Sequence, residues 1–340
     1  MLTLRGVGEL DPQARELLEF LGQSGTAQVH QHTLEQTRAY FEMAPSLDVV
    51  EPIACVRDLT VESPAGSLRL RVYHPDPESR LPVTVFFHGG GWVIGSLDSH
   101  DPLCRSLANR VPCVVVAVDY RLAPEHPWPA AVEDADFAVR WVAEHGDELE
   151  ADASLLAVAG DSAGGNLAAV TALKDRDSGR HQVAFQLLFY PATDYDWKSA
   201  SMRENSDGYF LTRADMKWFE NHYLQGQDPL HPYVAPMRAR SLAGLPPAFI
   251  ITAEFDPLRD QGNAYGRRLA AEGAAVTVRC YPGMIHGFVG MRALIKQGDV
   301  ALDDAAAALR AGLHANVAGV KKRGMVGGDG IEPPTSSMSS

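Results

Sequence analysis

The sequence predicts an α/β fold built around a mainly parallel β-sheet. Short, nearly all-apolar runs recur along the chain, and strands that helices cover on both faces have this composition. Helix-like stretches alternate with these runs, which is typical of consecutive βαβ units. The apolar runs cover residues 83–87, 113–118, 155–159, 185–190, 249–252 and 276–280. The helix-like stretches cover residues 103–110, 130–145, 163–174, 259–272 and 301–314.

Two amphipathic helices are predicted ahead of the first strand. Asp11 followed by Pro12 is a favourable helix start, with a capping residue and then a proline in the first turn. Thr33 and Gln36 have the spacing of a capping box for the second helix. Because both helices precede any strand signal, we expect them to lie outside the sheet.

An edge hairpin and a long insertion complete the predicted organisation. Residues 58–63 and 68–75 alternate apolar and polar side chains, which predicts an antiparallel pair at one sheet edge. The insertion at 194–243 is expected to form a lid over a site, with a surface excursion of no functional role as the alternative. The predicted divisions are N-terminal helices (1–45), a core in two parts (46–193 and 244–318), the insertion (194–243) and a disordered tail (319–340).

The composition is that of a globular protein and restricts its partners. Hydrophobic residues make up 46% and charged residues 21% of the 340 positions, enough for a sizeable core. The formal net charge of -13 argues against nucleic acid and anionic membrane surfaces as partners. We expect a cytoplasmic protein, because the sequence shows neither a membrane-spanning run nor the apolar core of a secretory signal. The four cysteines lack metal-ligand spacing and are expected to be free thiols, with a Cys104–Cys113 bridge as the alternative.

The strongest catalytic signal is the sequence Gly-Asp-Ser-Ala-Gly at residues 160–164, between a predicted strand and a predicted helix. This G-x-S-x-G arrangement is typical of the nucleophile elbow, a tight turn that exposes the serine hydroxyl. The flanking residues must be small, because the strand and the helix approach each other closely. Ser162 is therefore the candidate nucleophile, and the alternative is a tight glycine turn capped by a serine.

A serine hydroxyl also requires a base and an acid that orients this base. Among the twelve histidines, His286 is the candidate base because it lies in a glycine-flanked loop directly after the last strand. Asp256 is the candidate acid because it ends a strand. Glu254 and Asp260 compete with it for this role. The order serine, aspartate, histidine is that of the α/β-hydrolases and differs from the chymotrypsin and subtilisin orders.

Residues 88–92, His-Gly-Gly-Gly-Trp, directly follow a predicted strand. Consecutive glycines let backbone N–H groups turn toward a developing oxyanion without hindrance from side chains. The N–H of Ala163, just after the nucleophile, would be a further donor. The segment lacks the spacing of a phosphate-binding loop. We expect His88 to brace this loop through hydrogen bonds.

These motifs together resemble the bacterial hormone-sensitive-lipase family of esterases, in the branch whose elbow reads GDSAG. The resemblance covers residues 40 to 315, approximately. It rests on HGGGW (88–92), DYRLAPEHPWPAA (119–131), GDSAGGN (160–166), EN..GYFLT (204–212), DPLRD (256–260) and GMIHGF (283–288).

The resemblance implies an α/β-hydrolase fold, with an eight-stranded, mostly parallel sheet flanked by helices. It implies a helical cap made of the N-terminal helices and the insertion. The implied activity is that of a serine carboxylesterase, which hydrolyses short- to medium-chain acyl esters with water through an acyl-enzyme. No metal or organic cofactor is implied. Members of the family often form homodimers through the last strand, which here covers residues 275–281.

The resemblance also assigns roles to individual residues. The catalytic residues of the family fall on Ser162, Asp256 and His286. Its oxyanion donors fall on Gly89, Gly90 and Ala163, and the supporting residues of the motif are His88, Gly91 and Trp92. Independently of the resemblance, candidate walls of the substrate pocket are Trp92, Tyr195, Phe210, Phe288 and the apolar faces of the first two helices, with a place in the core as the alternative for each.

Two other functions fit the same scaffold. The fold does not select the leaving group, so an amide-cleaving hydrolase such as an arylformamidase is one alternative. A non-catalytic ligand receptor is the other. The presence of His286 argues against the receptor, because the plant gibberellin receptors that resemble this family lack the catalytic histidine.

Overall fold

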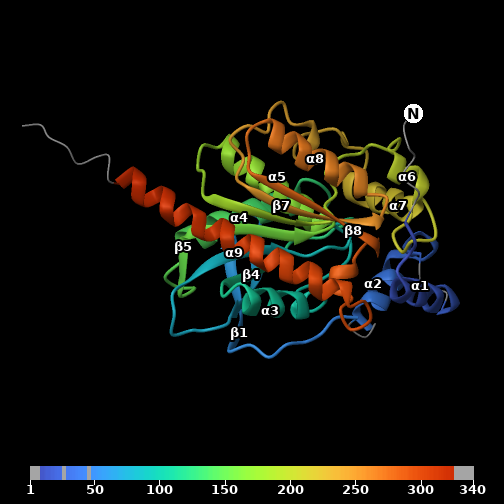
Figure 1. Cartoon of the computed structure of the whole chain (residues 1–340), viewed down its shortest axis with the longest axis horizontal. Helices are drawn as coiled ribbons and strands as arrows, with labels where there is room; N and C mark the ends of the chain where they lie inside the picture. Colours follow the sequence, from blue (N-terminus) through green and yellow to red (C-terminus); the bar gives the residue numbers. More distant parts are fainter. Residues whose placement is uncertain (1–7, 25–27, 44–46, 325–340) are drawn as a thin grey trace, which may run out of the picture.

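The computed structural model describes residues 8–24, 28–43 and 47–324, and within them an eight-stranded sheet lies between two layers of helices (Figure 1). The order across the sheet is β1-β2-β4-β3-β5-β6-β7-β8. The strands are β1 (Cys55–Ser63), β2 (Gly66–His74), β3 (Leu81–Phe87), β4 (Val114–Asp119), β5 (Ala151–Asp161), β6 (Val183–Phe189), β7 (Ala248–Phe255) and β8 (Val276–Ile285).

The strand directions confirm the predicted α/β class. Strand β2 pairs antiparallel with both β1 and β4, which places the predicted hairpin at one edge of the sheet. The other neighbouring strands, from β4 through β3 to β8, are all parallel. Parallel strands end at the same edge of a sheet, so the loops after β3, β5, β7 and β8 meet there.

Helices cover both faces of this sheet. Helices α4 (Ala130–Glu144), α5 (Ala163–Asp177) and α8 (Arg259–Ala271) pack on one face. Helices α3 (Asp101–Arg110) and α9 (Gln297–Gly324) pack on the other. The buried apolar residues accordingly form two clusters, one on each face. The central strands are apolar throughout because both of their faces are covered.

The two predicted N-terminal helices are α1 (Pro12–Ser24) and α2 (Leu34–Met43). The Asp11 carboxylate accepts the Gln13 N–H at 2.8 Å, which is the expected cap. Thr33 and Gln36 form the reciprocal hydrogen bonds of a capping box. Figure 1 shows α1 and α2 outside the sheet, at the same end of the molecule as α6 and α7.

The insertion at 194–243 contains α6 (Ala200–Glu204), α7 (Arg213–Leu224) and the 3₁₀ turn Pro236–Arg238. Residues 213–223 have a helix-like pattern in the sequence, and helix α7 agrees with it. Helix α6 was not predicted, because five residues are too few to show a helical period.

The C-terminal boundary predicted from the sequence is wrong for residues 319–324. Helix α9 continues to Gly324, so these residues are helical rather than part of a disordered tail. Alanine, lysine and arginine favour helix, and the segment that leads to Gly324 contains all three. The remainder of the predicted tail, 325–340, lies outside the described residues.

Two expectations from composition can be compared with the structure. All four cysteines are free, so the alternative Cys104–Cys113 bridge is wrong. Across the described ranges, the helices are too short or too polar to cross a bilayer.

Candidate active site

Ser162 occupies a strained turn between β5 and α5. Its backbone has φ 55° and ψ -116°, an arrangement that side chains rarely adopt. The turn is so close to the end of β3 that a Cβ on Gly164 would lie 1.9 Å from the Phe87 carbonyl oxygen. The small residues of the motif therefore allow the strand and the helix to meet, and Ser162 lies at the apex of the turn.

The three residues predicted as a triad lie within hydrogen-bond distance of one another. His286 Nε2 lies 2.9 Å from Ser162 Oγ, and His286 Nδ1 lies 2.8 Å from Asp256 Oδ2. An ionised carboxylate only accepts hydrogen bonds, so Nδ1 carries the proton and Nε2 is free to accept the serine proton. This is the tautomer that a histidine base requires.

Among the three candidate acids, Asp256 contacts His286, whereas Glu254 and Asp260 do not. The Asp256 side chain is fully buried, and its second oxygen accepts the Leu258 N–H at 2.8 Å. Glu254 accepts the N–H groups of Gly8 and Gly283. Asp260 instead accepts the Ser201 N–H at 2.8 Å, beside the start of α8.

The loop after β3 approaches the same point, but the structure corrects one predicted donor. The Gly89 N–H donates to Asp161 Oδ1 at 2.8 Å, so it cannot also serve a substrate oxygen. The N–H groups of Gly90, Gly91 and Ala163 have no acceptor within the described part of the chain. The available donors are therefore Gly90, Gly91 and Ala163, with Gly91 in place of Gly89. The sequence could not distinguish adjacent glycines, because the acceptor comes from a distant strand.

His88 braces the glycine loop (residues 88–92) as expected. Its Nδ1 lies 2.7 Å from the Gly89 carbonyl oxygen, and its ring stacks on Tyr120 with centroids 4.2 Å apart. Tyr120 also donates its hydroxyl to the His88 carbonyl at 2.8 Å. Burial lowers the pKa of His88 to about 3, so this side chain is neutral at physiological pH.

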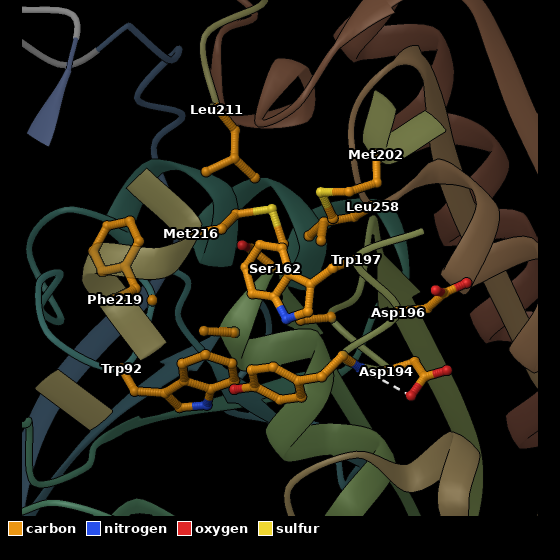
Figure 2. Close-up of a pocket in the computed structure, with 14 residues that line it drawn as sticks. Trp92, Ser162, Asp194, Asp196, Trp197, Met202, Leu211, Met216, Phe219 and Leu258 are labelled. Carbon is orange, nitrogen blue, oxygen red and sulfur yellow. Dashed lines mark hydrogen bonds between the residues drawn. The ribbon is translucent and has the colours of Figure 1, made fainter. Parts of the chain in front are cut away.

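A largely apolar cavity of about 60 Å³, partly open to solvent, lies beside Ser162. Figure 2 shows Trp197 and Met216 close to Ser162, with Trp92 on one side of the cavity and Leu211 on the other. The carboxylates of Asp194 and Asp196 point away from Ser162 in this view. The lining residues are Gly91, Trp92, Ser162, Ala163, Ala192, Asp194, Tyr195, Asp196, Trp197, Met202, Leu211, Met216, Phe219 and Leu258.

The predicted pocket walls are only partly correct. Trp92 and Tyr195 line the cavity, whereas Phe210 and Phe288 do not. Phe288 is fully buried, with its ring against Tyr190 and Tyr281, because the turn after His286 directs it into the core. Phe210 lies beside Gly287.

The apolar faces of the first two helices were also predicted to line the pocket. Among the described residues, none that lines the cavity belongs to α1 or α2. In α1, the buried Leu17 and Leu21 join the core cluster on the α3 and α9 face of the sheet. The apolar stripe of α1 therefore serves packing rather than substrate contact.

Most of the cavity wall that the sequence did not predict comes from the insertion. Met216 and Phe219 of α7 both line it, three residues apart on one side of the helix. Tyr223 continues this side of the helix and stacks on Trp92, with centroids 4.3 Å apart and planes 4° apart. The helical spacing of Met216, Phe219 and Tyr223 was the sequence signal that could have indicated this wall. The same spacing is also found on helices that face the core, so it could not identify a cavity wall by itself.

The geometry of the site favours nucleophilic catalysis by serine. The hydroxyl, the imidazole and the buried carboxylate form a relay beside free backbone donors and an apolar cavity. In the described ranges, no group of three or more His, Cys, Asp or Glu side chains has an arrangement that could hold a metal ion.

Comparisons with known proteins agree with this arrangement. The profile of a family described as alpha/beta hydrolase fold matches residues 84–290. The esterase LipI of Mycobacterium tuberculosis is 46% identical over 78% of this chain and 84% of its own length. The carboxylesterase NlhH of the same species is 42% identical, over 90% of this chain and 97% of its own.

A solved structure extends the similarity to three dimensions. The ester-hydrolase EH1AB1 from the metagenome of Lake Arreo, in complex with a bipyridine phosphonate derivative, superposes with a TM-score of 0.86. It is 40% identical to this chain, and the match covers 90% of this chain and 99% of that one.

Proposed function

The chain belongs to the α/β-hydrolase fold family, and we propose that Ser162, His286 and Asp256 are its nucleophile, its base and its orienting acid. The observation that carries this proposal is the relay of 2.9 Å and 2.8 Å contacts that ends on Ser162 beside the cavity. The enzyme is a serine carboxylesterase; among its relatives, NlhH is named a carboxylesterase and LipI an esterase.

In the proposed reaction, Ser162 attacks the ester carbonyl carbon while His286 Nε2 accepts the hydroxyl proton. The buried Asp256 stabilises the imidazolium that forms. The N–H groups of Gly90, Gly91 and Ala163 are the proposed donors to the negative oxygen of the tetrahedral intermediate.

The second half of the reaction uses the same groups. His286 donates its proton to the leaving alcohol, which departs and leaves the acyl group on Ser162. A water molecule, deprotonated by His286, then attacks this acyl-enzyme. The carboxylic acid leaves, and the proton returns to Ser162.

The cavity supports a preference for small, apolar esters of short to medium acyl chain length. Its walls near Ser162 are the side chains of Trp197, Met202, Met216 and Phe219. Methionine and aromatic side chains offer apolar contact area without a charged group for the substrate to satisfy. The carboxylates of Asp194 and Asp196 point away from Ser162 (Figure 2), so they supply no ionic contact beside the nucleophile.

We further propose that the N-terminal helices (1–45) and the insertion (194–243) form a cap over this cavity, as in the hormone-sensitive-lipase branch. The position of α1, α2, α6 and α7 at one end of the sheet supports this (Figure 1). A homodimer through β8 is also proposed, because this edge strand exposes Thr277, Arg279 and Cys280. Size-exclusion chromatography with light scattering tests the dimer.

The decisive experiment is hydrolysis of p-nitrophenyl esters from acetate to palmitate, with Ser162→Ala measured in parallel. We expect rapid turnover of the short esters and a loss of about 10⁶-fold in kcat for Ser162→Ala. A folded wild type that cleaves matched amides faster than esters would indicate an amidase. A folded wild type that binds ligands without turnover would indicate a receptor.

A further inference from the structure

The turn that carries Asp256 is fastened to the insertion. Strand β7 pairs with β6 as far as Ile251, and its register with β8 shifts between Ala253 and Phe255. The acid turn, which we define as residues 254–260, therefore begins where the pairing of the sheet becomes irregular. Several of its polar groups bond instead to α6 and to the residue that follows this helix.

Asn205, directly after α6, donates to two carbonyls of the acid turn. Its Nδ2 lies 3.2 Å from the Glu254 carbonyl oxygen and 3.2 Å from the Asp256 carbonyl oxygen. Carbonyl oxygens only accept hydrogen bonds, so the amide must direct its NH₂ group toward both of them. Asn205 is buried, and it holds the backbone of the proposed acid itself.

Ser201, in the first turn of α6, contacts the other half of the acid turn. Its hydroxyl donates to the Pro257 carbonyl at 2.9 Å and accepts the Asp260 N–H at 3.1 Å. Its own N–H donates to Asp260 Oδ2 at 2.8 Å. Ser201 is fully buried. Together with Asn205, it holds the acid turn on both sides of the Asp256 side chain.

The direction of the Asp256 carboxylate depends on this backbone. One of its oxygens accepts the Leu258 N–H, which belongs to the same turn, and the other faces His286 Nδ1 at 2.8 Å. A movement of the turn would therefore carry the carboxylate with it. The acid must keep this direction to hold the imidazole in its tautomer. A misplacement of about 1 Å can lower the rate of a reaction about 100-fold.

We propose that Ser201 and Asn205 are positioning residues for Asp256, so that the insertion as well as the sheet sets the geometry of the relay. This inference rests on the proposed function of the relay. Neither residue contacts the reacting atoms. Between them in the chain, Met202 lines the cavity together with Leu258 of the acid turn (Figure 2). Helix α6 thus connects the cavity wall to the proposed acid.

Asn205→Leu removes the amide donor at similar side-chain volume. Arg259 continues to donate to both carbonyls, from Nη1 to Glu254 and from its N–H to Asp256, each at 3.1 Å. Neither carbonyl is left unpaired, so the variant should fold. We expect kcat for p-nitrophenyl butyrate to fall about tenfold or more, with little change in KM. Ser201→Ala should lower kcat in the same way.

Arg203→Gln is the matched control on the same helix. Arg203 is exposed, and its side chain donates to the carbonyl of Lys198, away from the acid turn. The control should leave kcat and KM unchanged. Thermal melts on all three variants show that the kinetics are measured on folded protein.

Proton NMR gives a readout that a loss of stability alone would not move. The His286 Nδ1 proton, which faces the Asp256 carboxylate, should give a far-downfield signal in the wild type at neutral pH. A weaker hydrogen bond should move this signal upfield in folded Asn205→Leu and Ser201→Ala. The signal should keep its position in Arg203→Gln.

Full activity of the folded variants would overturn the proposal, and so would a lower kcat with an unmoved signal. Equal losses in Arg203→Gln would overturn it too. Should Asn205→Leu fail to fold, Ser201→Ala carries the test, because it deletes a single hydroxyl. A wild type that shows the downfield signal without turnover would refute the esterase function, whereas the NMR comparison would still decide the positioning role.

Discussion

Phe219 of α7 lies directly against Gly91 of the glycine loop, so closely that a Cβ on Gly91 would be 2.2 Å from Phe219 Cδ1. Gly91 also has a φ of 59°. The insertion therefore rests on the backbone that supplies a proposed oxyanion donor. The position of α7 and the geometry of the oxyanion hole are linked through this contact.

Gly91→Ala should lower kcat by about 100-fold or more, because the added methyl group must displace either the ring or the oxyanion donor. Gly66→Ala is the matched control. Gly66 also has a positive φ, but a Cβ there would meet nothing within 4 Å. The control should lose stability but not kcat per active site. Steady-state kinetics and thermal melts on both variants check this, and equal kcat losses would contradict it.

Asp215→Asn should loosen the attachment of α7 to the N-terminal segment. Asp215 accepts the His30 N–H, lies 2.7 Å from His30 Nδ1, and completes the capping box with Thr212. Loss of a capping interaction costs about 1 kcal/mol. We expect a higher KM and faster hydrogen exchange in α7. Asp228→Asn is the control, because this exposed carboxylate on the loop after α7 accepts, among the described residues, only the local Leu230 N–H. It should change neither quantity, and the same increase in both variants would refute a specific tether.

Trp197→Leu should shift the preferred acyl chain toward longer esters. Trp197 lines the cavity next to Ser162 (Figure 2), and its ring lies near Arg213 and Lys217, at 5.6 Å and 5.9 Å. A smaller side chain enlarges the cavity at this wall. Trp218→Leu is the control, because Trp218 packs on Phe219 and His222 and is not among the lining residues. The p-nitrophenyl ester series measures the preferred acyl chain length of both variants. An unchanged chain-length optimum in Trp197→Leu would show that this wall does not contact the substrate.

His88 should contribute to loss of stability in acid. Its pKa is about 3 in the folded protein because it is buried, against about 6.5 in an unfolded chain. Between these values the unfolded state binds more protons, so the free energy of unfolding falls as the pH falls from about 6.5 toward 3. Above about pH 6.5, His88 is neutral in both states and does not change the free energy of unfolding with pH.

His88→Asn should therefore flatten the decrease in melting temperature across this range, although the variant is less stable overall. His181→Asn replaces an exposed histidine with a residue that tolerates its φ of 53°, and should leave the pH dependence unchanged. Melting temperatures from pH 3 to 8, approximately, provide the measurement. Parallel curves for His88→Asn and wild type would show that His88 does not titrate on unfolding.

Much of this fold was visible in local patterns. The apolar runs predicted the parallel strands, because a strand buried on both faces has few positions for polar residues. Asp11 and Thr33 predicted the starts of α1 and α2, since a helix cap depends on residues close in sequence. The boundary at residue 319 failed, because a run of good helix formers can continue a helix into a segment with little apolar content.

From the residues alone, the sequence indicated Ser162 and His286, and the structure separated Asp256 from its competitors. Ser162, Asp256 and His286 each follow a strand, and parallel strands bring their ends to one edge of the sheet. Only the tertiary structure decided that Gly91 replaces Gly89 as a proposed donor and that Phe219 rather than Phe288 lines the cavity. Those outcomes depend on which distant groups meet, such as Asp161 with Gly89. The direction of a side chain or an N–H toward a remote partner leaves no periodic signal in the sequence.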